Sequence, residues 1–185
     1  MSIKSSQTRI KAGAADGLGE GEFLAYPSTF TRTPDSYGDV VAKGAFARGI
    51  AERKAAGVQL AGLFAHRADD LSAYVAHAID EGEDEHGWWV KGAFDLEDPA
   101  SAKVYRLVKG GRIRELSFMY DTRDAANVTL PNGVKANELR DLDVHEFSFV
   151  LVGANRDTSI TAVKTASTAR PRLAKARAIL ALLEG

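Results

Sequence analysis

Cysteine is absent from the 185 residues of this chain, and that absence removes several kinds of chemistry together. A disulfide scaffold, a zinc or iron–sulfur site with cysteine ligands and a cysteine nucleophile all require the missing side chain. A covalent catalyst built from these residues must therefore use a serine, a threonine, a lysine or a carboxylate. The absence also fits a reducing compartment.

An excess of charge is missing as well, since 24 Lys and Arg residues face 25 Asp and Glu residues, for a net charge of −1. A surface dedicated to nucleic acid normally shows a strong basic excess, so we expect no specific nucleic-acid partner. No stretch approaches the ~20 consecutive apolar residues of a membrane span. Residues 1–12 are polar and basic and lack the apolar core of a secretory signal. We therefore expect no membrane partner.

Apolar residues make up 45% of the chain, which is typical of a globular protein, and the length suits one domain. Residues 1–21 lack periodicity and end in Gly17, Gly19 and Gly21, so we expect a flexible arm there. The folded domain is expected over residues 22–165. A basic amphipathic helix is expected over residues 166–185, after a linker rich in Thr, Ser and Pro.

The C-terminal segment differs from the rest in composition. Five basic residues against one acidic residue give residues 164–185 a local charge of +4. Leu173, Ala176, Leu180 and Leu183 recur at helical spacing. The pattern predicts a helix that packs on the domain or on a second copy of the chain, or that tethers the chain to another protein or to nucleic acid.

Short strand-like runs separated by turns dominate the domain. Such runs cover residues 23–30, 58–65, 71–79, 87–96, 113–120, 127–130, 134–137, 142–152 and 159–164. Helical patterns cover residues 45–56 and 99–109, and glycines follow both. Because hairpins connect most of the runs, we predict an α+β fold that is mainly β. We expect an antiparallel sheet curled into a closed or nearly closed β-barrel with a few flanking helices.

Four histidines are candidates for a catalytic base, and their positions differ. His66 ends an apolar run, where a strand fixes the backbone while the ring reaches outward. His86 lies in an acidic turn, where it is expected to be solvated. His77 lies within a hairpin as a cross-strand neighbour, and His145 belongs to a strand-like run.

Residue parity places two further polar side chains together. In residues 116–120 the bulky side chains share one face of the strand, and Ser117 points to the other. In residues 144–151 His145 shares a face with the phenylalanines, and Glu146 lies on the opposite face. If the aromatic faces form the core, Ser117 and Glu146 point outward, where they can meet His66 at a strand end. A nucleophile, a base and an orienting acid are the parts of a serine hydrolase site.

Two other patterns resemble binding sites. The acidic run at residues 80–86 lacks the alternating ligand spacing of a calcium loop, so it predicts a solvated turn rather than a metal site. The glycines at residues 17–21 have the spacing of a dinucleotide loop, but they precede a strand-like run and no helix. We therefore predict neither a metal nor a cofactor.

Four segments, in one order along one domain, carry a resemblance to a known family. They are residues 35–41 (DSYGDVV) with 44–46 (GAF), residues 63–66 (LFAH), residues 111–118 (GRIRELSF), and residues 144–150 (VHEFSFV) with 154–157 (ANRD) and 163–164 (VK). Over residues 22–165 the chain resembles the prohead maturation proteases of tailed phages. That family is a serine peptidase group distantly similar to the herpesvirus capsid-maturation protease, and the resemblance implies a fold like that of the herpesvirus enzyme.

The family pattern implies a role for each candidate residue. Ser117 corresponds to the nucleophile, His66 to the general base and Glu146 to the third member, which holds the imidazole in the useful tautomer. The herpesvirus relatives use a second histidine as third member, so His145 is the alternative to Glu146, although parity disfavours it. A loop comparable to the one at Asn155 and Arg156 supplies the oxyanion hole in those relatives, so the backbone there is the candidate.

The resemblance also implies a function and partners. It implies a serine endopeptidase that cleaves scaffold segments of the major capsid protein, and its own chain, inside the assembling procapsid in the host cytoplasm. A catalytically silent scaffold or binding module of the same fold is the alternative, and the presence of all three site residues counts against it. Self-association as a homodimer or larger assembly is expected. The C-terminal helix is then expected to dock on a second protease copy or on the scaffold segment.

Overall fold

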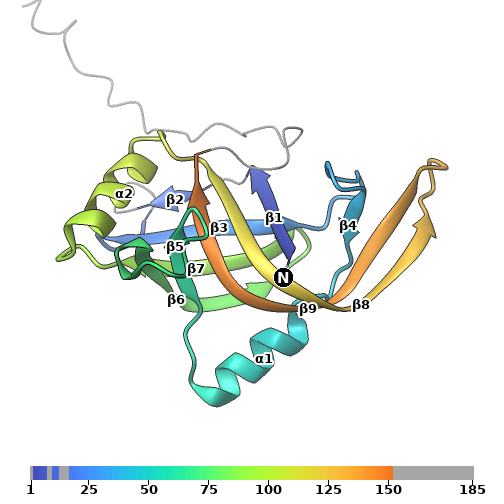
Figure 1. The fold of residues 1–185 in the computed structure, drawn as a ribbon, viewed down its shortest axis with the longest axis horizontal. Helices are drawn as coiled ribbons and strands as arrows, with labels where there is room; N and C mark the ends of the chain where they lie inside the picture. The colour runs from blue at the N-terminus through green and yellow to red at the C-terminus, as the bar shows by residue number, and fades with distance from the viewer. Residues whose placement is uncertain (1, 8–9, 13–16, 152–185) are drawn as a thin grey trace, which may run out of the picture.

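One curled sheet of nine strands, with two α-helices beside it, forms the part of the chain that the structure describes (Figure 1). This computed structural model describes residues 2–7, 10–12 and 17–151. The prediction of a mainly β protein with a few helices is confirmed. No helix among these residues is long and apolar enough to cross a membrane.

The strands and helices have the following bounds. The strands are β1 (Ser2–Gln7), β2 (Lys11–Ala12), β3 (Glu22–Thr29), β4 (Asp39–Val41), β5 (Ala61–Phe64), β6 (Tyr74–Glu83), β7 (Gly87–Phe94), β8 (Glu115–Thr129) and β9 (Lys135–Val150). The helices are α1 (Ala47–Ala56), the 3₁₀ turn η2 (Leu71–Ala73) and α2 (Pro99–Lys109). The strand order across the sheet is β1-β8-β9-β5-β6-β7-β3-β2, and β4 pairs with β9 beside this path.

The sheet is strongly curled but open, and it is mixed, whereas the sequence predicted a closed or nearly closed antiparallel barrel. β1 and β2 end the strand order without pairing with each other. β4 and β5 run parallel to β9, whereas the other neighbours are antiparallel. The parallel pair of β5 and β9 arises because β9 inserts between β5 and β8, which the β6–β7 hairpin and α2 separate in the chain. Local hairpin patterns do not reveal such an insertion.

The N-terminal segment contains strands where its composition predicted a flexible arm. β1 pairs antiparallel with β8, from Ser2 opposite Tyr120 to Gln7 opposite Glu115. β2 pairs antiparallel with β3. An edge strand needs only backbone hydrogen bonds along one side, and any residue except proline can supply them. A lack of hydrophobic periodicity in residues 1–21 was therefore no guide to their pairing.

Both predicted helices are confirmed, and their ends follow the expected chemistry. α1 ends at Gly57, whose φ of 63° is in the left-handed region that glycine adopts readily. α2 begins after Asp98, whose carboxylate accepts a hydrogen bond from the Ser101 backbone N–H at 2.7 Å. α2 buries Val104 and Val108, and it packs beside β6 and β7.

Aromatic side chains fill the inner face of the curled sheet. The fully buried ones are Trp88, Phe23, Phe46, Phe118, Phe147 and Phe149. Phe23 contacts Phe147 and Phe149, with ring centroids 5.8 and 5.3 Å apart. The backbone of β5 passes close to this cluster, since a Cβ atom at Gly62 would lie 2.7 Å from the Phe147 ring. The core thus fixes β5 against β9.

A β-bulge interrupts the long hairpin of β8 and β9. Met119 lies opposite Glu146, but Tyr120 lies opposite Val144, so His145 is the additional residue of β9. Beyond the bulge the alternation of faces is reversed, because Val144 is buried while His145 is exposed.

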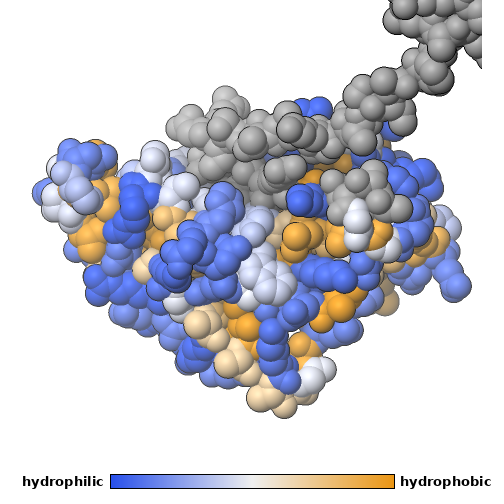
Figure 2. Space-filling model, turned by 180° about the vertical axis from the view of Figure 1, so that it is seen from behind, coloured by the Kyte–Doolittle hydropathy of each residue, from blue (hydrophilic) through white to orange (hydrophobic). Residues whose placement is uncertain are grey.

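The surface opposite to the view of Figure 1 is largely hydrophilic, with apolar side chains in small patches (Figure 2). The large apolar side chains that are exposed among the described residues belong to different elements, for example Ile3, Val58, Leu71 and Val134. Apolar residues scattered in this way are normal for a protein surface.

Candidate active site

The middle of the sheet brings together the end of β5, the first half of β8 and the second half of β9. β9 lies between the other two strands. Ser148 of β9 is the register partner of Ser117 in β8 and of Leu63 in β5. Glu146 lies two residues before Ser148, on the same face of β9. Because His66 follows β5 directly, all of the predicted site residues that the structure describes lie in this region.

The turn after β5 holds His66 in an unusual backbone conformation. Ala65 and His66 both have a φ of 58°, in the left-handed region that residues other than glycine seldom adopt. The Ala65 N–H donates to the Phe149 carbonyl at 3.1 Å, and the His66 N–H donates to the Ser148 hydroxyl at 3.0 Å. Each residue in such a conformation costs about 1–3 kcal/mol, and such strain clusters at functional sites.

A buried carboxylate orients the His66 ring. Nδ1 lies 2.6 Å from Oε1 of Glu146, and the two side chains are 13% and 4% exposed. An ionised carboxylate only accepts hydrogen bonds, so with Glu146 ionised Nδ1 is the donor, and in the neutral ring Nε2 is then the nitrogen with the lone pair. The other oxygen of Glu146 accepts a hydrogen bond from the Ser148 hydroxyl at 2.5 Å. Ser148 therefore links the carboxylate to the backbone of His66 and fixes both.

The second ring nitrogen of His66, Nε2, is buried and makes no hydrogen bond within the described part of the chain. Most buried polar atoms have a partner, and an exception calls for an explanation such as a catalytic role. A neutral imidazole whose Nε2 can accept a proton is what a general base requires.

Ser117 lies on the face that parity predicted, but it is fully buried rather than exposed. Its hydroxyl donates a hydrogen bond to the backbone carbonyl of Lys4 at 2.9 Å. β1 thus covers the edge of β8 at this residue. The structure brings His66 and Glu146 into contact and places Ser117 on the neighbouring strand, with its hydroxyl directed to β1.

His145 does not share the core face of the phenylalanines, so that part of the parity argument was wrong. The bulge turns His145 outward, where Nε2 lies 3.0 Å from Oδ2 of Asp121. The carboxylate that contacts His66 belongs to Glu146. The geometry therefore favours Glu146 over His145 as the residue that orients the base.

The acidic run at residues 80–86, which forms the end of β6 and the turn to β7, connects the sheet to α1 and to the segment before it. Glu81 is buried rather than solvated, and it pairs with Arg53 of α1 at 2.7 Å. Glu83 accepts hydrogen bonds from the backbone N–H groups of Gly44 and Phe46, which precede α1. No group of three or more His, Asp or Glu side chains is placed to hold a metal ion in residues 2–7, 10–12 and 17–151.

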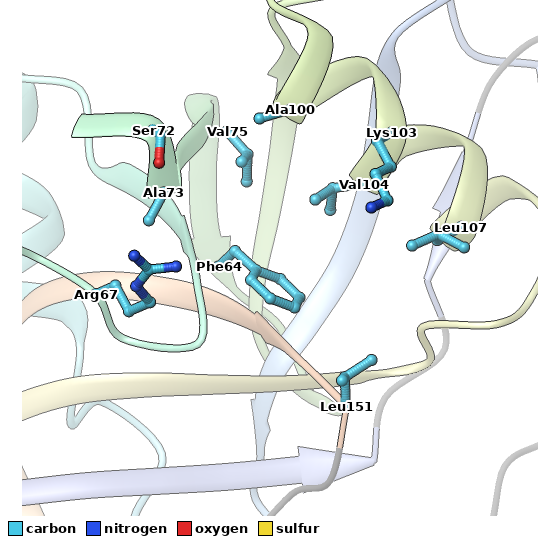
Figure 3. Close-up of a pocket in the computed structure, with 10 residues that line it drawn as sticks. All are labelled: Phe64, Arg67, Ser72, Ala73, Val75, Ala100, Lys103, Val104, Leu107 and Leu151. Carbon is cyan, nitrogen blue, oxygen red and sulfur yellow. The ribbon is translucent and has the colours of Figure 1, made fainter. Parts of the chain in front are cut away.

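A cavity of about 370 Å³ lies beside the His66 turn (Figure 3). Phe64 and Arg67, which lie just before and just after this turn in the chain, line one side, and Lys103 and Val104 of α2 line the other. The wall is mostly apolar, with two basic side chains at it.

Some predicted residues lie outside the described part of the chain, and two contacts of the candidate site were not predicted from the sequence. Asn155 and Arg156, the expected oxyanion hole, lie outside the described residues, as do the expected strand at 159–164 and the C-terminal helix. Ser148 was missed, although its parity with Glu146 could have marked it. The contact of Lys4 with Ser117 had no sequence signal, since it depends on the pairing of β1.

Comparison with known proteins identifies the family of the chain. The family model of the caudovirus prohead serine proteases matches residues 8–171, which include His66, Ser117 and Glu146. No curated protein and no solved structure matches the chain. The likeness to the herpesvirus enzyme therefore stays a prediction. From the extent of the family match, the chain belongs to the caudovirus prohead serine proteases.

Proposed function

We propose that this chain is an active serine endopeptidase in which Ser117 is the nucleophile, His66 the general base and Glu146 the carboxylate that orients the base. Membership of a serine protease family of capsid maturation supports the activity. The observation that carries the proposal is the buried contact of 2.6 Å between His66 and Glu146, which leaves Nε2 of His66 without a partner.

The Ser117 hydroxyl must turn from the Lys4 carbonyl to Nε2 of His66 before it attacks. Catalytic hydrogen bonds of this kind often form only with the substrate in place. Ser117 Oγ then adds to the carbonyl carbon of the scissile peptide while its proton passes to Nε2. Glu146 stabilises the imidazolium, which returns the proton to the leaving amine. Water, activated by the same nitrogen, then hydrolyses the acyl-enzyme.

Scaffold segments of capsid proteins, and the chain itself, are the proposed substrates, cleaved inside the procapsid. The prohead in the family description supports this location. The backbone at Asn155 and Arg156 is the proposed oxyanion hole. Residues 22–165 stay as the proposed protease domain, to whose sheet residues 2–7 and 11–12 of the N-terminal segment add strands. Residues 166–185 stay as the proposed helix, which is proposed to dock on a second copy or on the scaffold segment.

A catalytically silent scaffold protein of the same fold is the second candidate. The observation that favours it is the engagement of the Ser117 hydroxyl by β1 rather than by His66. The two candidates make opposite predictions about the reactivity of Ser117.

A fluorophosphonate probe, which reacts covalently with activated serines, separates the candidates. The full chain should be labelled at Ser117, as located by mass spectrometry of its peptides, and the Ser117→Ala chain should not be labelled. Incubation with the capsid protein of the same phage should yield fragments with the wild-type chain alone. An unlabelled Ser117 together with intact capsid protein would favour the silent scaffold.

A further inference from the structure

β1 lies along β8 as a bound peptide would. It pairs antiparallel with residues 115–120 of β8 at the edge of the sheet. Proteins often bind extended peptides by adding them as a strand to such an edge. The carbonyl oxygen of Lys4 accepts a hydrogen bond from the Ser117 hydroxyl at 2.9 Å. In a serine protease the carbonyl beside the nucleophile belongs to the residue on the amino side of the cleaved bond, and Lys4 is the residue of β1 whose carbonyl contacts Ser117.

A carboxylate is held in place for the Lys4 side chain. Nζ of Lys4 lies 2.9 Å from Oδ2 of Asp35, and the two side chains are 10% and 4% exposed. The other oxygen of Asp35 accepts hydrogen bonds from the backbone N–H groups of Tyr37 and Asp39, at 3.0 and 2.9 Å. The turn thus fixes the carboxylate and directs Oδ2 to a ligand. A buried charge that loses its partner is strongly destabilising, so this position demands a cation.

The surroundings of Asp35 add further negative charge. Asp39 belongs to the same turn, and its Oδ1 accepts a hydrogen bond from the Asn137 side chain at 2.9 Å. Burial, and after it the charges of Asp39 and Asp35, raise the pKa of Tyr120, which lies on β8 opposite Ser2. The carboxylates of Asp35 and Asp39 therefore place negative charge beside the edge of β8, where the Lys4 side chain lies.

We propose that the edge of β8 is the substrate groove, and that Asp35 selects a lysine or arginine on the amino side of the cleaved bond. β1 occupies this groove in cis until a substrate segment displaces it. The inference rests on the proposed function and adds the substrate class to it. It also gives residues 35–41, one of the segments of the family resemblance, a direct part in recognition.

The proposed selection of a basic residue by Asp35 is tested with peptides that have the sequence of residues 2–7 and differ only at the position of Lys4. Fluorogenic versions carry lysine, arginine, norleucine or glutamate at that position, and the wild-type chain is compared with Asp35→Asn. Asparagine keeps the Oδ1 acceptor of the turn while it removes the charge. The wild-type kcat/KM for lysine and arginine should exceed that for norleucine by about 10–100-fold, because a desolvated charge pair is involved.

In the Asp35→Asn chain that ratio should fall below about 3-fold, since no charge remains to be satisfied. An equal rate for the lysine and norleucine peptides in the wild type would overturn the inference. So would an undiminished lysine preference in Asp35→Asn.

Occupancy of the groove by β1 is tested with Lys4→Glu in the full chain. Glutamate would face Asp35, and like-charge repulsion should release β1. The kcat/KM for the lysine peptide should rise by roughly 3–10-fold, because more of the chain is then competent to bind. Lys11→Glu in β2 makes the same change of charge near the same terminus and should have no effect. Equal kcat/KM values for Lys4→Glu and the wild type would contradict occupancy by β1.

Binding separates a failure of this inference from a failure of the proposed function. In Ser117→Ala the affinity of a fluorescent lysine peptide, measured by anisotropy, should increase when Lys4→Glu is added. It should decrease when Asp35→Asn is added to that double variant. If the peptide binds in this way but a chain with Ser117 intact does not cleave it, the proposed protease activity is refuted and the proposed substrate groove stands. If the chain cleaves peptides without a preference for basic residues, the proposed protease activity stands and the proposed recognition by Asp35 is refuted.

Discussion

The two halves of the β8–β9 hairpin differ sharply, although they are the same pair of strands. In the half that carries the candidate site, the outward face holds buried polar side chains. Ser117 and Ser148 are 0% exposed there, and Glu146 is 3% exposed. Beyond the bulge at His145, residues 121–129 and 135–143 carry mainly exposed or half-buried polar side chains. Figure 1 shows this far half projecting from the rest of the sheet beside β4.

Surface ion pairs and a small apolar cluster support the far half, in addition to Leu139 and Leu142, which reach the main core. Arg48 of α1 contacts Asp141 and Asp143 at 2.9 and 2.5 Å. The cluster consists of Val40, Leu130 and Ala136, with Val128 beside it. Exposed ion pairs contribute about 0–1 kcal/mol each, whereas a buried polar network is costly to break. The polar side chains of the candidate site therefore differ from those of the far half in being buried, not in being more numerous.

Ser117→Ala should have the largest effect on the near half. Loss of a triad serine costs on the order of 10⁶ in kcat. The fold should persist, because the hydrogen bond that the hydroxyl donates to the Lys4 carbonyl contributes only about 1 kcal/mol. Cleavage of a lysine peptide and thermal melting measure the two effects. Activity within tenfold of the wild type would remove Ser117 from the mechanism.

Glu146→Gln and His145→Ala compare the two sides of the bulge directly. Glutamine in place of Glu146 should reduce kcat by roughly 10⁴, since the amide cannot stabilise the imidazolium and favours the wrong tautomer of His66. Alanine in place of His145 removes only an exposed contact with Asp121, so kcat should stay within about 3-fold and stability within about 1 kcal/mol. The same peptide assay serves both variants. A severe loss in His145→Ala alone would reverse the assignment.

Glycine substitutions extend the comparison to packing. In Gly62→Ala the new Cβ would lie 2.7 Å from the Phe147 ring and 2.9 Å from the Ala76 Cβ, so we expect a loss of about 2–3 kcal/mol. Gly133, at the far tip, has a φ of 80° and open space, so Gly133→Ala should cost about 1 kcal/mol of backbone strain. Urea denaturation provides both values. A loss at Gly62 no larger than the loss at Gly133 would mean that the close approach of β5 to Phe147 costs no more than backbone strain at an open turn.

Asp143→Asn should show the smallest effect, and its size should depend on pH. A hydrogen bond from Arg48, then one from Arg123, lowers the pKa of Asp143 in the folded chain. A lowered pKa gives stability that is complete above the unfolded value near 3.9 and is lost as the pH falls through the folded value. The variant should therefore be less stable than the wild type by under ~1 kcal/mol at pH 7. Melting curves from pH 7 down to pH 2 should show this difference shrinking, and a constant difference would exclude the charge as its cause.

Local patterns predicted the features that local forces decide. Helix formers and end signals located α1 and α2, and alternation located the β6–β7 hairpin and the outward faces of Ser117 and Glu146. The bulge at His145 escaped prediction, because an additional residue in a strand depends on how two strands fit together. The pairing of β1 escaped as well, since it uses backbone groups that every sequence has. Residue identity could not show which distant segments meet.

The position of β9 has a consequence for biosynthesis. β9 follows every other described strand in the chain, yet it pairs with β4, β5 and β8 in the middle of the sheet. Ribosomes add about 5–20 residues per second, so β5 and the His66 turn emerge several seconds before Glu146 and Ser148 do. Until β9 has been made, the histidine has neither its carboxylate nor the serine that holds its backbone. A nascent chain of this topology therefore has no assembled site with which to attack its neighbours on the polysome.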